Sequence, residues 1–197
     1  MTLRIVGFTG LAGAGKDTAA AALIARGWVR VGLADPMKRA CAEWFGWSPL
    51  LLWGDSDLRE TPDSARNGLT PRHALQQLGT EFGRACWEDV WVEVLLATAA
   101  DILAGEATYT PDGGLLYGAP GSAPPGVVVT DVRFRNEADA IRNAGGLVLR
   151  VERPGAGLRG AAAGHASEAG TGVVVDGVVY NRGTVEQLHD AVVRLTA

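Results

Sequence analysis

The chain has 197 residues, 47% of them hydrophobic and 20% charged, and it carries a formal net charge of −4 at pH 7. A chain of this length and hydrophobic content can bury the core of one globular domain, and it is too apolar to be disordered. The acidic balance argues against a general nucleic-acid binder, which needs a basic face, yet it leaves room for a compact cationic pocket that binds phosphates.

Strand and helix signals alternate over the N-terminal segment. Leu3–Thr9 is a short apolar run that predicts a buried strand, and the Ala-rich stretch Lys16–Arg26 predicts a helix. Trp28–Leu33 is a second strand candidate. Asp35 is placed to cap a helix that runs to about Phe45 and has a proline at its first position.

The middle of the chain is expected to be helical after a segment without a clear signal. Residues 47–70 combine a short apolar piece with a long polar stretch and favour no single element. Pro71–Arg84 predicts a helix with Thr70 as its N-cap, and a further helix is expected over Glu88–Leu103. The apolar stripe of the first helix is Leu75, Leu78 and Phe82. A different face carries polar residues at i, i+4 and i+8, namely Arg72, Gln76 and Thr80.

The C-terminal part returns to alternating strands and helices. Gly105–Gly126 is rich in Gly and Pro and predicts a long loop with a hairpin at Pro111–Gly114. The expected strands are Val127–Asp131, Leu147–Val151 and Val173–Asp176. The expected helices are Arg135–Ala144 and Val185–Leu195.

This alternation predicts an α/β fold with an open parallel sheet that is covered by helices on both faces. Ligands of such sheets bind at the carboxyl ends of the strands, where Gly10, Asp35, Asp131 and Arg153 fall. We therefore expect one domain, residues 1–197, built as a three-layer sandwich around a mostly parallel five-stranded sheet. Residues 36–104 would form a helical region, and residues 153–170 a small lid-like segment.

Residues 10–16, GLAGAGK, match the GxxxxGK pattern of a P-loop between a strand and a helix. Glycines in such a loop let backbone N–H groups turn around phosphates, and the following helix adds its positive dipole. The alternative is a Gly-rich turn without a ligand. The pattern predicts a P-loop NTPase fold with ATP bound by Gly10, Ala12, Gly13, Ala14, Gly15, Lys16, Asp17 and Thr18.

Lysine is rare in this chain, since 16 of the 18 basic residues are Arg and the two lysines are Lys16 and Lys38. Because Arg and Lys are not interchangeable, a lysine in this background is a candidate for chemistry. Lys16 is expected to reach the β- and γ-phosphates. Asp17 stands where a P-loop usually has Ser or Thr, so Thr18 would contact phosphate while Mg²⁺ is held through water or by an acid elsewhere.

Several short motifs beyond the P-loop are distinctive. They are GKDT (15–18), ADPMK (34–38), LQQLGTEFGR (75–84), TDVRFRNE (130–137), RPG (153–155) with HASE (165–168), and NRGT (181–184). In this order, from about Ile5 to Leu195, they resemble the bacteriophage-type deoxynucleoside monophosphate kinases. The resemblance implies the reaction ATP + dNMP → ADP + dNDP, small nucleotides as partners and a homodimer as the oligomeric state. The loop 105–126 lies outside the resemblance.

The acceptor of such a reaction needs its own site in the helical region. Lys38 either meets the acceptor phosphate or is a solvated lysine of its helix, and Asp35 either binds the acceptor or caps that helix. Gln76 suits a base edge, and Trp87 either stacks on a base or packs in the core. The expected substrate-binding residues are Asp35, Lys38, Arg72, Gln76, Arg84, Trp87 and Arg133. The alternative for the arginines is an exposed salt bridge.

The acceptor phosphate is already an anion near neutral pH, so catalysis depends on bringing two polyanions together. Asp131 lies where a strand-end acid could hold Mg²⁺, and Arg133 should face the same cleft. Arg153 and Arg159 flank the lid-like segment, which either closes on the γ-phosphate or is a surface loop. The expected catalytic residues are Lys16, Asp131, Arg133, Arg153 and Arg159, and the metal candidates are Asp131 and Thr18. Glu137 is expected to be the structural partner of an arginine.

Two other functions fit the same sequence. One is a P-loop kinase of another small metabolite, of the dephospho-coenzyme A or phosphomevalonate type. A hydroxyl acceptor would then require a base, and Asp35 would be the obvious one. The other is a non-catalytic module that binds ATP without transferring phosphate.

Membrane, zinc and disulfide signals are missing from the sequence. Cys41 and Cys86 lack a CxxC spacing, the three histidines lack a zinc-site spacing, and no apolar run approaches the roughly 20 residues of a membrane span. The N-terminus has no signal-peptide layout. We therefore expect a cytoplasmic protein, in the host cytoplasm if a phage encodes it, with neither a membrane nor a nucleic acid as partner.

Overall fold

The core of the molecule is a parallel five-stranded sheet. The structure is a computed structural model, and it describes residues 4–118, 122–157 and 172–197. The sheet order is β2-β5-β1-β6-β7, and every pair of neighbours is parallel. Its strands are β1 (Ile5–Thr9), β2 (Val29–Val31), β5 (Val127–Val129), β6 (Leu147–Glu152) and β7 (Gly177–Tyr180). The three valines of β5 are fully buried, which explains why this strand is a continuous apolar run in the sequence.

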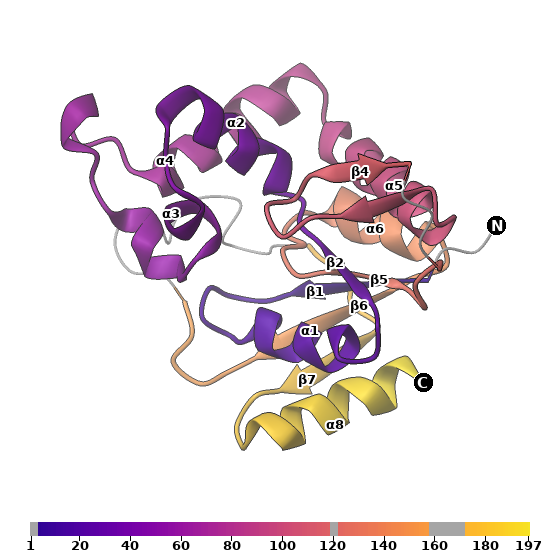
Figure 1. Ribbon diagram of the computed structural model, residues 1–197. Coiled ribbons are helices and arrows are strands. Elements are labelled where there is room, and N and C mark those ends of the chain that lie inside the picture. Colours follow the sequence, from indigo (N-terminus) through magenta and orange to yellow (C-terminus); the bar gives the residue numbers. More distant parts are fainter. Residues whose placement is uncertain (1–3, 119–121, 158–171) are drawn as a thin grey trace.

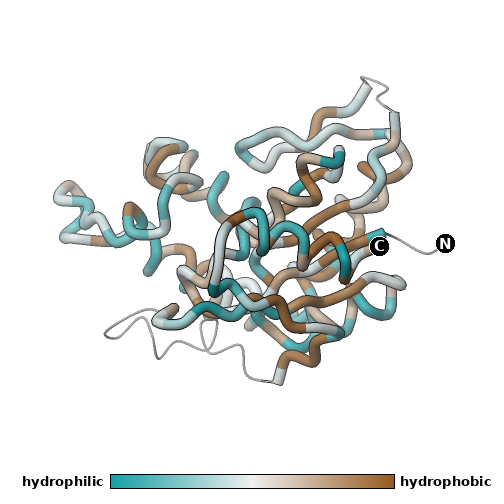
Figure 2. Tube along the Cα trace, turned by 90° about the horizontal axis from the view of Figure 1, so that it is seen from below, coloured by the Kyte–Doolittle hydropathy of each residue, from teal (hydrophilic) through white to brown (hydrophobic). Residues whose placement is uncertain are grey.

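Helices cover both faces of the sheet and complete the three layers (Figure 1). One face packs against α1 (Lys16–Ile24) and α8 (Val185–Thr196), and the other against α5 (Val90–Leu103) and α6 (Arg135–Asn143). Figure 2 shows hydrophobic colouring along the strands and hydrophilic colouring along outer loops and helix faces. The predicted α/β class of the P-loop NTPase type is confirmed, with a sheet that is entirely parallel.

A helical region stands at the carboxyl end of the sheet (Figure 1). Its small core contains Cys41, Trp47, Leu52 and Ala74. The indole Nε1 of Trp47 donates to Asp63 over 2.8 Å, which ties two parts of the segment 47–70 together. The elements are α2 (Asp35–Phe45), α3 (Pro49–Trp53), the 3₁₀ turns η1 (Ser56–Glu60) and η2 (Ser64–Arg66), α4 (Pro71–Gln76) and the π-helix η3 (Gln77–Arg84).

The predicted helix 71–84 exists, but its second half is a π-helix, and this changes which residues share a face. Phe82, expected in the apolar stripe, is 65% exposed, whereas Leu75 and Leu78 pack against the helical-region core. The i→i+5 pattern of a π-helix rotates the last residues away from the i, i+3, i+7 stripe of an α-helix. The polar face prediction holds, because Arg72, Gln76 and Thr80 all line one cleft.

Two other sequence expectations are corrected. The expected strand 173–176 is not a strand, and pairing with β6 begins only at Gly177. The carboxylate of Asp176 accepts from the backbone N–H of Val148 over 2.8 Å, so a side chain takes the place of a ladder carbonyl. Asp35 is not the N-cap of its helix, because Ala34 holds that position and Asp35 lies in the first turn.

The hairpin expected around Pro111–Gly114 is present as strands β3 (Ala107–Tyr109) and β4 (Leu115–Tyr117). Figure 1 shows it between α2 and α5, and its inner residues Tyr109 and Leu115 pack partly against the core. In the described ranges no helix has both the length and the apolar character needed to cross a membrane.

Candidate active site

The loop between β1 and α1 has the backbone of a phosphate cradle. Gly10, Gly13 and Gly15 have φ values of 134°, 74° and 96°, which disfavour residues with a side chain. The Nζ of Lys16 donates to the carbonyls of Gly10 over 2.8 Å and of Leu11 over 2.9 Å, which holds the ammonium over the loop.

The loop is also held from outside. A Cβ at Gly10 would collide with the carbonyl oxygen of Val151, and one at Gly15 would collide with the amide of Asn181. That amide donates to the carbonyl of Ala14 over 2.9 Å. The NRGT motif at 181–184 therefore contributes its first residue to the shape of the P-loop.

We expect Gly10→Ala to destabilise the protein far more than Gly13→Ala. Both positions have a positive φ, which costs an alanine about 1–2 kcal/mol. Only Gly10 adds a collision with a neighbouring backbone, whereas a Cβ at Gly13 meets nothing within 4 Å. Urea unfolding of both variants checks this, and equal losses of stability would show that the contact with Val151 is not tight.

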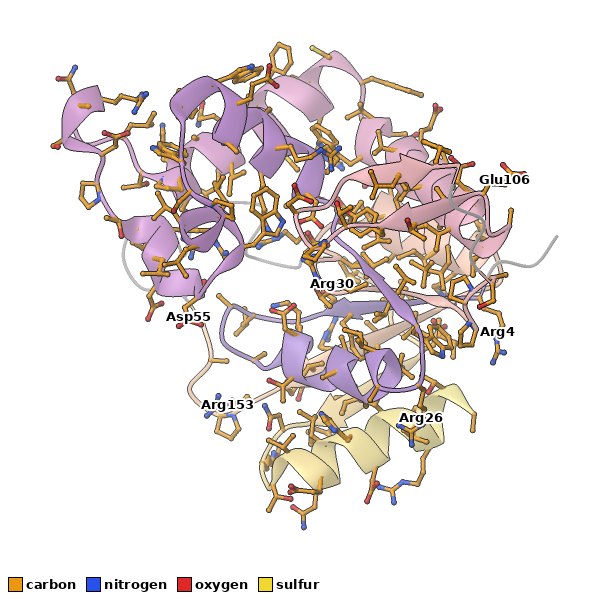
Figure 3. All side chains as sticks on the ribbon, in the orientation of Figure 1. Arg4, Arg26, Arg30, Asp55, Glu106 and Arg153 are labelled. Atoms are coloured by element: carbon orange, nitrogen blue, oxygen red, sulfur yellow. The ribbon has the colours of Figure 1, made fainter. Side chains whose placement is uncertain are left out.

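A cleft opens between the P-loop and the helical region; we call it the central cleft. Its P-loop wall contains Ala12, Gly13, Lys16 and Asp17. Five further cationic residues line it from five different segments, namely Arg30, Lys38, Arg59, Arg72 and Arg133. Figure 3 places the Arg30 side chain near the middle of the molecule, between the sheet and the helices.

These cations lie close enough to oppose one another's charge. Burial lowers the pKa of Arg59 from its ordinary value, and repulsion from Arg72 lowers it further. Burial also lowers the pKa of Lys38, against the attraction of Asp35. Like charges that converge in a partly buried space weaken the folded state unless an anion joins them. Asp35 offsets Arg30 and Lys38, and Glu60 pairs with Arg72, so an anionic ligand would offset only the charge that remains.

Sequence reasoning missed two of these cations. Arg30 is the one charged residue of the short, partly buried strand Val29–Val31, and this placement was a usable signal. Arg59 lies in the segment 47–70, which has no periodicity to interpret. Its guanidinium donates to the carbonyls of Leu52 over 2.9 Å and Gly54 over 3.2 Å, and these bonds fix it at the cleft wall.

Asp35 is fully buried and accepts five hydrogen bonds. Its Oδ1 accepts from Lys38 Nζ at 3.2 Å and from Trp53 Nε1 at 3.0 Å. Its Oδ2 accepts from Arg30 at 3.0 Å, from the Gly32 N–H at 3.1 Å and from the Tyr109 hydroxyl at 2.9 Å. Burial opposes its ionisation, but Lys38 and Arg30 hold the pKa of Asp35 below its ordinary value. The carboxylate thus holds two cleft cations in place.

Asp131 lines the central cleft and is hydrogen-bonded to the turn before α2. Its two carboxylate oxygens accept from the N–H groups of Leu33 and Ala34, each over 2.9 Å. The side chain is therefore oriented by the backbone of the neighbouring strand end. Among the described residues, no group of three or more His, Cys, Asp or Glu side chains is arranged to hold a metal ion by itself.

Arg84 and Trp87 do not line the central cleft. The guanidinium of Arg84 lies 3.9 Å from the ring centroid of Phe134 and donates to the Asn136 side chain over 3.1 Å. It also lies 4.0 Å from Glu137, so the expected pairing of Glu137 with an arginine is present. Trp87 is 48% exposed. Arg84 therefore joins η3 to α6, and Trp87 lies on the surface between η3 and α5.

Glu137 is almost completely buried beside the central cleft. Its Oε2 accepts from the N–H groups of Arg133 over 2.7 Å and Phe134 over 3.0 Å. Burial raises the pKa of Glu137 to about 7, although these hydrogen bonds work in the opposite direction. The carboxyl group therefore titrates near neutrality while it fixes the loop that carries Arg133.

This raised pKa predicts a pH dependence of stability. A carboxyl whose pKa is raised in the folded protein stabilises it fully below the unfolded value of 4.5 and loses that contribution as the pH passes through about 7. We expect the free energy of unfolding to fall by roughly 1–3 kcal/mol between pH 5 and pH 8. Urea unfolding at both values should show a smaller fall for Glu137→Gln. Glu88→Gln is the control, since Glu88 is the exposed partner of Arg84. If the free energy of unfolding of Glu137→Gln falls between pH 5 and pH 8 as much as that of the wild type, the prediction is contradicted.

Part of the lining of the central cleft carries no charge. Met37, Leu75, Gly79 and Trp91 line it together with Gln76. The amide nitrogen of Gln76 is buried and has no hydrogen-bond partner among the described residues. A buried donor of this kind is usually satisfied, so a ligand with an acceptor atom would complete it.

The remaining predicted residues lie outside this cleft or outside the described residues. Arg153 is exposed, and Figure 3 places it on the loop after β6, away from the helical region. The chain after it touches the P-loop, because the N–H of Gly157 donates to the carbonyl of Ala12 over 2.9 Å. Thr18 is exposed, and its carbonyl contacts His189 of α8 at 2.8 Å. Arg159 and most of the lid-like segment 153–170 lie outside the described residues.

Comparison with known proteins identifies the family. No family model matches the chain. Over 193 residues the chain is 34% identical to an Acanthamoeba polyphaga mimivirus protein named "Putative deoxynucleotide monophosphate kinase", and the match covers 96% of this chain and 94% of that protein. The chain belongs to the deoxynucleotide monophosphate kinase family.

This family is the one that the sequence motifs resemble, so the resemblance is confirmed, while the bacteriophage origin stays a prediction. The crystal structure of TT1252 from Thermus thermophilus aligns with 99% of this chain and 97% of its own chain, at 18% sequence identity and a TM-score of 0.48.

Proposed function

We propose that the protein transfers the γ-phosphoryl group of Mg·ATP to a deoxynucleoside monophosphate, which gives ADP and a deoxynucleoside diphosphate. The observation that carries this proposal is the central cleft, in which a P-loop faces cations from β2, α2, η1, α4 and the loop after β5. A binding site for one nucleotide needs only the P-loop wall of this cleft. Two facing walls support a donor and an acceptor phosphate in one space.

The main task of this site is to hold two polyanions together. Two unit charges 4 Å apart repel each other by about 4 kcal/mol at an effective dielectric constant near 20. Lys16 would neutralise the donor phosphates, and Lys38, Arg30 and Arg72 would neutralise the acceptor phosphate. Arg133, on the loop after β5, would meet the transferring group between them.

Mg²⁺ fits the donor atoms that the cleft offers. Asp131 and Asp17 present carboxylates to the cleft. Carboxylate oxygens suit Mg²⁺, which usually retains several water ligands in proteins. Because both oxygens of Asp131 already accept backbone N–H groups, we assign Asp131 to hold the ion through water. When bound with ATP, Mg²⁺ neutralises charge on the β- and γ-phosphate oxygens. Thr18 is assigned no contact with the ion, since its side chain does not line the cleft.

The alternative of a hydroxyl acceptor has less support. It needs a base, and the sequence offered Asp35 for that role. A general base must have a lone pair that reaches the substrate, and a pKa near the working pH suits it best. Asp35 has five donors on its two oxygens and a pKa below the ordinary value. A phosphate acceptor, already ionised, needs no such base.

The test is ADP formation with Mg·ATP against a panel of dTMP, dGMP, dCMP and dAMP and their ribose counterparts, with Lys16→Ala as negative control. Turnover with at least one deoxynucleotide, lost in the variant, supports the proposal and identifies the acceptor base. No turnover with any of these monophosphates, but turnover when dephospho-coenzyme A or phosphomevalonate is added as acceptor, would support another metabolite kinase. ATP binding without acceptor-dependent ADP release would support the non-catalytic module.

A further inference from the structure

The β3–β4 hairpin is attached to the element that carries the acceptor-side lysine. The hydroxyl of Tyr109 on β3 donates to Asp35 in α2 over 2.9 Å. At the hairpin turn, the guanidinium of Arg39, also in α2, donates to the carbonyl of Gly113. The hairpin is thus docked on the first turns of α2 through two hydrogen bonds, 74 residues away in sequence in each case.

The close approach at this contact depends on glycine. Gly113 has a φ of +76°, and a Cβ built on it would collide with the Cβ of Asp35. The hairpin turn therefore lies directly against the aspartate. Tyr109 itself is half-buried and packs partly against the core below the hairpin, so its ring holds the hydroxyl in a fixed position.

The aspartate in turn holds two cations at the central cleft. Arg30 shares Oδ2 with the Tyr109 hydroxyl, and Lys38 donates to Oδ1 over 3.2 Å. Both cations line the central cleft, whose lining does not include Tyr109, and all three residues line a neighbouring cavity. The contacts run from Tyr109 to Asp35 and from there to Arg30 and Lys38. A hydrogen bond to a carboxylate fixes its orientation, and with it the orientation of the cations that it binds.

We propose that Tyr109 is a positioning residue for the acceptor phosphate, which acts through Asp35 on Arg30 and Lys38. This inference rests on the proposed function and assigns a role in it to the hairpin 107–117. The tyrosine hydroxyl is placed to orient the carboxylate, and the oriented carboxylate fixes the two cations before the acceptor arrives. Less of the binding free energy is then spent on ordering them.

The test is Tyr109→Phe, which removes the hydroxyl and keeps the ring. The matched control is Tyr117→Phe in the same hairpin, where an exposed tyrosine donates to Asp101 over 2.6 Å. We expect Tyr109→Phe to raise the KM for the deoxynucleoside monophosphate about tenfold, the effect of one lost hydrogen bond to a charged group. The KM for ATP should stay within twofold, and Tyr117→Phe should match the wild type in both constants.

A second readout does not depend on turnover. Because Lys16 and Lys38 are the two lysines of the chain, ¹³C-lysine labelling gives two side-chain signals that can be compared by NMR. In Tyr109→Phe the Lys38 signal should shift and the Lys16 signal should not. Tyr117→Phe should leave both unchanged.

The outcomes separate the inference from the proposed function. Absence of acceptor-dependent turnover in the wild type would overturn the proposed function, and the lysine signals would still test the positioning contact. Normal turnover with an unchanged acceptor KM and Lys38 signal in Tyr109→Phe would overturn the inference alone. Equal effects of both tyrosine variants would also overturn it, because they would show a general loosening of the hairpin.

Discussion

Lys16→Ala is expected to reduce kcat with Mg·ATP and the preferred deoxynucleotide by roughly 10³-fold or more, with little loss of stability. Lys16 lines the central cleft, and its Nζ lies over the loop carbonyls of Gly10 and Leu11. In the proposed reaction, a fixed ammonium at this place would stabilise charge on the transferring phosphoryl group, and an alanine would leave that charge without a partner. Since the ammonium of Lys16 donates to the carbonyls of Gly10 and Leu11 in its own loop, and not to a group of the core, folding should survive.

Steady-state ADP release and circular dichroism of the variant test both halves of this prediction. Arg26→Ala is the control for the loss of a positive charge next to α1, because Arg26 follows that helix and bonds the carbonyl of Ala22 over 2.7 Å, away from the cleft. Arg26→Ala should retain turnover. A folded Lys16→Ala protein with more than a tenth of the wild-type kcat would contradict the role of this lysine.

Asp35→Asn is expected to cause the largest loss of stability of any single substitution considered for this protein, about 3–5 kcal/mol. The substitution removes the negative charge that Arg30 and Lys38 share, at a fully buried position. Two cations would lose the carboxylate that both of them contact, and only the weaker attraction of Asp131 would act on both. An asparagine would also present an NH₂ group to donors that need an acceptor. Urea unfolding at pH 7 measures the effect.

The pH dependence of this effect has a definite sign. A carboxyl whose pKa is lowered in the folded protein contributes stability above its unfolded pKa of about 3.9, and that contribution is lost as the pH falls through the folded value. The gap between the wild type and Asp35→Asn should therefore be constant near neutrality and narrow below about pH 4. Asp139→Asn breaks an exposed pair with Arg135 and should cost less than about 1 kcal/mol. A comparably small loss in Asp35→Asn would contradict the role of Asp35 as the anchor of the cleft cations.

The parts of the site that local sequence determines could be predicted. A P-loop is a run of glycines at fixed spacing followed by a lysine, and its shape comes from the backbone of these same residues. The cleft-facing side of α4 and η3 was visible as the i, i+4, i+8 set Arg72, Gln76 and Thr80. Asp131 could be found because parallel strands end at the same edge of a sheet.

The parts that depend on contacts distant in sequence could not be predicted. The environment of Asp35 is set by Tyr109, 74 residues away, and by Trp53 from a segment without periodicity. Nothing in the neighbours of Asp35 distinguishes a helix cap from a carboxylate with five donors. The exposed position of Phe82 follows from a π-helix, which tertiary contacts such as the bond from Trp91 Nε1 to the Gly79 carbonyl help to hold.

The distribution of lysine makes the surface of this protein unusual for covalent labelling. An amine-directed reagent meets the chain terminus, Lys16 and Lys38, and both lysines line the central cleft. Acylation of side-chain amines is therefore directed to the central cleft and not spread over the exterior. Protection of the lysines from such a reagent would report directly that the cleft is occupied. Immobilising the protein on a support through its lysines would block the same cleft, so ligand binding could not be measured on protein coupled in this way.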